Sequence, residues 1–209
     1  MSDVVKFIED NKVLVICRGY YGDDLRKVIT ALHKGGIRMA EVTFDQADPD
    51  AIEKTCGAIR MIREEFPDMK VGSGTVTCVE HVIATKEAGG EFCLSPNVNI
   101  DVIKATKAAG LVSIPGAMTP SEILDAHDAG AEIFPAGWLG LGYLKDVKGP
   151  VNHVKFLAAA GVNEENFADF LKAGYSAAGI SGRLLDKKVI AEGNYDELTR
   201  RAQTFVKIA

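Results

Sequence analysis

The sequence predicts an α/β fold, a (β/α)8 TIM barrel with an extra amino-terminal helix. Eight short apolar runs alternate with longer segments in which apolar residues recur every three or four positions. Several of the runs are too continuously apolar for a strand with one wet face, which is typical of parallel sheets covered on both sides. No break in composition interrupts the alternation, so residues 1–209 are expected to form one domain. A doubly wound open sheet is the alternative.

The elements follow one another in a regular order along the chain. The extra helix is predicted at Val4–Asp10. The predicted strands are Val13–Cys17, Met39–Phe44, Lys70–Thr75, Phe92–Ser95, Val112–Pro115, Glu132–Pro135, Val154–Ala158 and Ala177–Ile180. The residues predicted to cap the intervening helices at their N-termini are Asp23, Asp48, Thr77, Asn99, Thr119 and Asn163. Glycines that suit left-handed C-terminal caps are Gly35, Gly36, Gly89, Gly90, Gly110, Gly130 and Gly174.

Composition excludes several classes of protein. The chain has a net charge of −5 and no basic run, which argues against a nucleic-acid partner. It has no stretch of 18 apolar residues that could span a membrane, and its first residues lack the pattern of a signal peptide. The four cysteines are far apart, so we expect buried, reduced thiols and a cytoplasmic location. No motif predicts a metal site, and no cofactor is expected.

Glu41 is the first candidate for catalysis, because it is a carboxylate inside the otherwise apolar run Met39–Phe44. A buried carboxyl group has a raised pKa, which suits it to carry protons near neutral pH. The alternative is a structural ion pair with Arg18, which follows the preceding strand. Arg18 could also hold a substrate carboxylate through two hydrogen bonds.

Small residues at other strand ends suggest where a ligand would lie. Gly72–Thr75 ends the third predicted strand and would let a ligand approach the backbone closely. After the last two strands come Gly161 and the segment Ser181–Arg183, where barrels of this kind often hold a phosphate. Ordinary tight turns would use the same glycines, so both interpretations remain open.

Together these segments resemble the 2-keto-3-deoxy-6-phosphogluconate (KDPG) and 4-hydroxy-2-oxoglutarate (KHG) aldolase family along essentially the whole chain. The segments that carry the resemblance are Ile16–Arg18, Gly35–Ile37, Glu41–Phe44, Val71–Val76, Leu94–Pro96, Ile114–Glu122, Phe134–Ala136 and Gly161–Asn163. Each segment is short, but their order and spacing are specific.

The resemblance implies a trimeric aldolase that cleaves a 4-hydroxy-2-oxo acid to pyruvate and an aldehyde. It implies that Glu41 is the proton shuttle and that Arg18 and Thr75 bind the pyruvate half. It implies a pocket lined by Pro96 and Phe134. The phosphate end would lie around Gly161, Ser181 and Gly182.

The chain departs from the family at the sixth strand. The family carries its imine-forming lysine there, in a phrase such as Ile-Val-Lys-Leu-Phe-Pro, whereas this chain reads Ala131-Glu132-Ile133-Phe134-Pro135 and is about three residues shorter. A carboxylate cannot form an imine, and Lys145 and Lys155 are the nearest lysines in sequence. In addition, Asp45 stands where phosphogluconate-type members have an arginine. The chain is therefore predicted to be either an aldolase with altered chemistry or an inactive homologue that binds a 2-oxo acid or a phosphorylated ligand; a third explanation is that residues of the sixth strand are missing.

Overall fold

A parallel sheet of eight strands forms the centre of the molecule, in the order β5-β4-β3-β2-β1-β8-β7-β6. The computed structural model describes residues 3–135 and 139–209. The strands are β1 Val13–Cys17, β2 Met39–Thr43, β3 Lys70–Gly74, β4 Phe92–Ser95, β5 Val112–Pro115, β6 Ile133–Pro135, β7 Lys155–Ala159 and β8 Ala177–Ile180. Each predicted strand is therefore found, with ends that move by no more than one residue.

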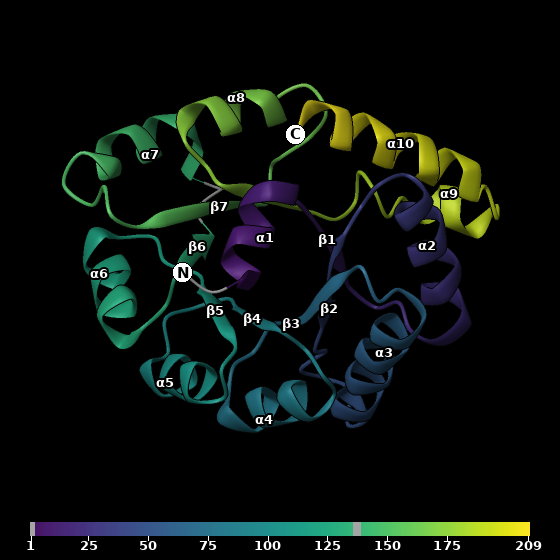
Figure 1. Ribbon diagram of the computed structural model, residues 1–209, viewed down its shortest axis with the longest axis horizontal. Coiled ribbons are helices and arrows are strands. Elements are labelled where there is room, and N and C mark those ends of the chain that lie inside the picture. The colour runs from purple at the N-terminus through teal and green to yellow at the C-terminus, as the bar shows by residue number, and fades with distance from the viewer. Residues whose placement is uncertain (1–2, 136–138) are drawn as a thin grey trace.

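Helices α2 to α10 lie outside the sheet, which curls around α1 (Figure 1). Their bounds are α1 Asp3–Asn11, α2 Gly22–Lys34, α3 Ala51–Glu65, α4 Val79–Glu87, α5 Ile100–Ala108, α6 Pro120–Ala129, α7 Gly140–Lys148, α8 Phe167–Ala173, α9 Lys187–Ala191 and α10 Tyr195–Ile208. Among these residues, no helix is both long and apolar enough to cross a membrane. The same residues contain no group of three metal-ligating side chains.

Alternation along the strands divides the apolar side chains between two layers. In β2, Ala40 and Val42 belong to the outer layer that packs against the helices, whereas Met39 belongs to the inner layer enclosed by the sheet. Successive side chains of a strand point to opposite faces, so Glu41 and Thr43 share the inner face with Met39. A polar pair on β2 therefore faces the interior of the curled sheet.

Helix α1 fills the amino-terminal end of this interior. Its Val5 and Ile8 are buried against inner-layer residues of the strands. The Glu9 carboxylate accepts a hydrogen bond from Lys155 Nζ at 2.9 Å, which ties the helix to the start of β7. Because α1 occupies one end, the carboxyl-terminal end is where the sheet can hold a ligand.

Strands β5 and β6 form the two edges of the sheet, and no strand ladder joins them among the described residues. Among the described residues, Glu132 N, just before β6, donates a backbone hydrogen bond to Ser113 O of β5 at 3.3 Å. The structure thus has a curled, parallel eight-stranded sheet with helices outside, as an α/β fold requires. Full closure into a TIM barrel stays a prediction.

The helix-capping predictions are confirmed at some ends and wrong at others. Asn99 accepts hydrogen bonds from Asp101 N and Val102 N, and Thr119 forms a capping box with Glu122. Gly130 and Gly174 are the left-handed C-caps that the sequence predicts. The predicted N-caps that do not stand at the observed cap positions are Asp23, Asp48, Thr77 and Asn163.

Two of these four misses, Asp48 and Asn163, have a common cause. The observed N-cap residues Tyr21, Asp50, Cys78 and Asn166 lie one to three residues away, and none makes a side-chain cap. Asp48 and Asn163 instead accept hydrogen bonds from backbone N–H groups two residues ahead, which builds turns before the helices. An Asp or Asn side chain caps a turn as readily as a helix, so sequence alone does not separate the two.

Candidate active site

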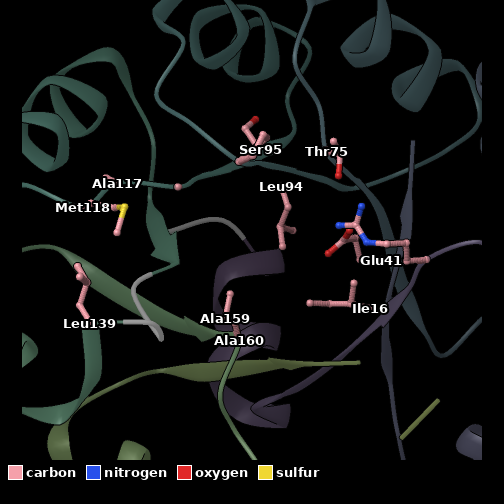
Figure 2. A pocket seen from close by; sticks show the side chains of 13 residues that line it. Ile16, Glu41, Thr75, Leu94, Ser95, Ala117, Met118, Leu139, Ala159 and Ala160 are labelled. Carbon is pink, nitrogen blue, oxygen red and sulfur yellow. The ribbon is translucent and has the colours of Figure 1, made fainter. Parts of the chain in front are cut away.

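A cavity of about 360 Å³ opens at the carboxyl-terminal ends of the strands. Figure 2 shows its side chains, which come from strand ends and from the loops that follow them. The residues that line it are Ile16, Arg18, Glu41, Thr75, Leu94, Ser95, Pro96, Gly116, Ala117, Met118, Leu139, Ala159 and Ala160. Four residues predicted for the site, Arg18, Glu41, Thr75 and Pro96, are thus brought together.

Glu41 is the acidic group of this cavity, and only 3% of it is exposed. Burial raises the pKa of its carboxyl group to about 7, although a hydrogen bond from Thr43 and the positive charge of Arg18 both act to lower it. The Thr43 hydroxyl donates to Glu41 Oε1 at 2.9 Å. A carboxyl group in this environment can both accept and donate a proton near neutral pH.

Gly74 provides the space in which the Glu41 carboxylate lies. A Cβ atom built on Gly74 would come 1.4 Å from Glu41 Oε1 and 2.1 Å from its carboxyl carbon. Gly74 pairs with Thr43 across the ladder between β2 and β3, so the two strands fix this approach. The glycine is therefore required by the position of the carboxylate rather than by its own backbone.

Thr75 follows Gly74 directly and has a φ of +57°, a conformation that costs a residue other than glycine some free energy. Ala160, which follows β7 and also lines the cavity, has a φ of +70°. Strained residues of this kind concentrate at binding sites, where the surrounding structure holds them. Figure 2 shows the Thr75 side chain on the same side of the cavity as Glu41.

Arg18 follows β1 and is exposed, yet it lines the cavity close enough for its charge to act on Glu41. Among the described residues, no ion pair joins the two side chains. The alternative of a structural ion pair inside the sheet is therefore not what the structure shows, and the guanidinium remains able to contact a ligand carboxylate.

The residues predicted for the phosphate end lie around a second cavity. It measures about 340 Å³, shares Ala160 with the first, and includes Gly161, Ser181 and Gly182 in its lining. The Ser181 hydroxyl donates to Ile16 O at 3.2 Å, and Arg183 pairs with Glu164 at 2.8 Å. Both groups already have partners within the chain. Phe134 lies on β6, and its side chain is outside the described part of the structure.

Comparison with known proteins gives a family. A family profile described as KDPG and KHG aldolase matches residues 4–201. This chain belongs to that family. The KHG/KDPG aldolase of Escherichia coli strain K12 is 33% identical to it over 182 residues, which are 85% of this chain and 82% of the relative. The 2-dehydro-3-deoxy-phosphogluconate aldolase of Haemophilus influenzae is 26% identical over 211 residues, 99% of this chain and 97% of the relative.

Solved structures of the family share this fold. The KDPG aldolase of Legionella pneumophila, with pyruvate captured as a covalent carbinolamine intermediate, superposes with a TM-score of 0.85. It is 24% identical and is matched over 97% of each chain. A native KDPGal structure has a TM-score of 0.81 at 26% identity, covering 94% of this chain and 93% of the other.

Lysine is missing from the cavity of this family member. None of the described residues that line it is a lysine, and residues 133–138, whose side chains are not described, include none in the sequence. Lys155 is at the opposite end of the sheet, bound to Glu9 of α1. Lys145 is exposed on α7 and is not part of the cavity lining. Neither lysine lines the cavity that contains Glu41.

Sequence reasoning missed the apolar part of the cavity. Met118 and Leu139 line it, although neither lies in a strand. Ala117 and Met118 follow β5 in a loop, and Leu139 directly precedes α7. Periodicity identifies strands and helices but does not say which loop residues meet above the sheet, so no signal in the sequence marks this pair.

Proposed function

We propose that this chain cleaves a 4-hydroxy-2-oxo acid to pyruvate and an aldehyde, with Glu41 as the proton shuttle. The observation that supports this is the buried carboxyl group with a pKa of about 7 beside Arg18 in an otherwise mostly apolar cavity. Perturbed carboxyl groups that line cavities are typical of catalytic sites. Membership in an aldolase family agrees with this chemistry.

The substrate would bind with its carboxylate and 2-oxo group at Arg18 and Thr75. Ionised Glu41 then accepts the proton of the C4 hydroxyl, the C3–C4 bond breaks, and its electron pair passes through C2 to the oxo oxygen. The aldehyde leaves, and Glu41 returns its proton to C3 of the pyruvate enolate. The step balances without water or an external acid, and Glu41 ends as it began.

The group that accepts the electrons sets this chain apart from lysine-dependent aldolases. In the Legionella protein, pyruvate is captured as a carbinolamine, and such an adduct needs an amine. Here the negative charge on the oxo oxygen would be stabilised by the Arg18 guanidinium. An enolate is a poorer product than the enamine that an imine gives, so we expect slower cleavage than a lysine would support.

A second candidate function follows from the same absence of lysine. A chain without the imine could bind a 2-oxo acid, or a phosphorylated ligand at the second cavity, without cleaving it. The buried carboxyl group of Glu41 favours the first proposal, since a purely binding site gains nothing from a carboxylate that is costly to bury.

Exchange of the pyruvate methyl protons with deuterium, followed by NMR, tests the proposal. The wild-type protein is expected to catalyse the exchange, with a rate that rises with pH to a plateau and a midpoint near pH 7, because ionised Glu41 is the base. Glu41→Gln is expected to lose at least 100-fold in rate. Glu87→Gln, at an exposed carboxylate at the end of α4, is the matched control. Exchange in Glu41→Gln at the wild-type rate would refute the shuttle.

Borohydride reduction in the presence of pyruvate separates the mechanisms. Because no lysine lines the cavity, the intact protein is expected to keep its mass. A pyruvate adduct on any lysine would overturn the imine-free mechanism and would identify the nucleophile. Binding of pyruvate without exchange or adduct would instead favour the non-catalytic homologue.

We further propose the remaining features that the family resemblance implies: closure of the sheet into one (β/α)8 domain over residues 1–209, assembly as a homotrimer, and a cytoplasmic location. The reducing cytoplasm would suit the chain's four free cysteines, of which Cys17, Cys56 and Cys93 are buried.

A further inference from the structure

The geometry points to a substrate with an apolar tail: we propose that the cavity takes a 2-oxo acid whose end remote from the carboxylate is a short hydrocarbon group. This inference rests on the proposed function, because it places the 2-oxo acid head at Arg18 and Glu41. It goes beyond that function by naming the class of aldehyde that the cleavage releases.

The cavity has a polar end and an apolar end. Figure 2 shows Glu41 and Thr75 on one side, while Met118 and Leu139 lie on the opposite side. Ala117 accompanies Met118, and Leu94 and Ala159 lie between the two ends. A ligand whose head is held at the polar end must extend its tail along these apolar side chains, where hydrocarbon gains free energy by leaving water.

Met118 forms a solvent-exposed side of the apolar end of the cavity. Its residue is 59% exposed, which is unusual for a large apolar side chain beside a cavity. The backbone around it is nevertheless held on both sides: Met118 N donates to Glu122 Oε2 at 2.9 Å, and Met118 O accepts from the Tyr143 hydroxyl at 2.9 Å. A fixed backbone that carries a flexible thioether allows the side chain to fold over tails of different shapes.

A phosphorylated tail finds little to bind in this arrangement. Arg18, at the polar end, is the cation among the described residues that line the cavity. In the neighbouring cavity, Arg183 pairs with Glu164 and the Ser181 hydroxyl donates to Ile16 O. A phosphate there would have to compete with both partners, whereas an apolar tail needs no partner to be displaced.

Calorimetric titration of the intact protein with 2-oxo acids that share one head group tests the proposal. The probes are pyruvate, 2-oxobutanoate, 4-methyl-2-oxopentanoate and 2-oxoglutarate. Each added methylene is expected to lower Kd about fourfold, so that 4-methyl-2-oxopentanoate binds at least about tenfold more tightly than pyruvate. 2-Oxoglutarate, whose tail is charged, is expected to show no gain.

A variant of the apolar wall gives the second measurement. Met118→Gln keeps the length of the side chain but makes it polar, and we expect it to reduce the ratio of affinities for 4-methyl-2-oxopentanoate and pyruvate about fivefold. Ile83→Gln is the matched control, because Ile83 is 53% exposed on α4 and does not line the cavity. This control is expected to leave the ratio unchanged.

The possible outcomes distinguish the two proposals. Pyruvate binding and methyl exchange without any gain from apolar tails, or tighter binding of 2-oxoglutarate or of a phosphorylated 2-oxo acid, would overturn the apolar-tail inference and leave the proposed function standing. An unchanged ratio in Met118→Gln would also overturn it. Failure of every 2-oxo acid to bind would refute the proposed function itself.

Discussion

The backbone pairing between β2 and β3 is far more complete than the contact between β5 and β6, the two edges of the same sheet. Strands β2 and β3 pair over their whole length, from Met39 with Lys70 to Thr43 with Gly74. At β5 and β6, one backbone hydrogen bond crosses between the edges, and the buried Ser113 hydroxyl has no hydrogen-bond partner among the described residues. The fully paired β2–β3 ladder holds the candidate catalytic carboxylate on β2, whereas no ladder joins β5 to β6 among the described residues.

This difference has a chemical consequence. Glu41 depends on close packing, because its raised pKa comes from burial and its carboxylate lies against Gly74. The family's lysine would belong to β6, which has only three residues here. In the proposed mechanism, the carboxyl group for proton transfer is present, whereas none of the described residues that line the cavity offers an amine for an imine.

The largest effect is expected from placing a lysine ahead of Ile133 in β6. We expect that inserting Ile-Val-Lys between Glu132 and Ile133 creates a protein that borohydride links to pyruvate, because the added lysine supplies the amine that the cavity lacks. The same insertion with methionine in place of the lysine is the matched control for length. Mass spectrometry reads both, and an unmodified lysine-bearing variant that still binds pyruvate would show that the edge cannot direct the amine into the cavity.

The substitution Gly74→Ala tests the well-paired β2–β3 ladder, where Glu41 lies. The added Cβ overlaps the Glu41 carboxylate, so the side chain must move, and methyl exchange is expected to fall about 100-fold. Overpacking should also lower the free energy of unfolding by about 1–3 kcal/mol. Gly57→Ala, in α3 where a Cβ meets open space, is expected to stabilise the protein slightly. Retention of exchange in Gly74→Ala would mean that Glu41 does not act from its observed position.

The pH dependence of stability is the third way to test the comparison. The folded pKa of Glu41, about 7, lies above the value of 4.5 for a free glutamate, so the folded state binds the extra proton between these values. The stabilising contribution of protonated Glu41 should therefore be complete below pH 4.5 and be lost as the pH rises to 7. This loss lowers the free energy of unfolding by about 3 kcal/mol in total. Urea unfolding of wild type and Glu41→Gln should show this difference between pH 4.5 and 8, and parallel curves would contradict the raised pKa.

The smallest effect on stability is expected from removing a hydrogen bond that links the segments after β5 and β6. The Tyr143 hydroxyl on α7 binds Met118 O after β5, so it links elements on the two sides. Tyr143→Phe removes this hydrogen bond at a partly exposed site and should cost about 1 kcal/mol of unfolding free energy. Tyr20→Phe removes a hydroxyl for which the described residues provide no hydrogen bond, and should be neutral. Equal losses in both variants would indicate that the link contributes nothing.

Sequence patterns predicted the helices and strands because these elements depend on residues that lie close together in the chain. Apolar runs and helical periodicity located all eight strands, and Asn99 and Thr119 were found as caps since their partners lie within three residues. Glu41 stood out for the same reason: a charge inside an apolar strand must be buried, and burial by itself raises a carboxyl pKa. The absence of a lysine in the sixth strand was likewise readable from the residues alone.

Only the tertiary structure decided which of these residues share a cavity. It brought Arg18, Glu41, Thr75 and Pro96 together, but it assigned Gly161, Ser181 and Gly182 to a neighbouring cavity. It also placed Met118 opposite Glu41, although 77 positions separate them in the chain. Distances across a curled sheet depend on strand order and on how tightly each pair of strands is joined, and a local pattern of residues carries neither quantity.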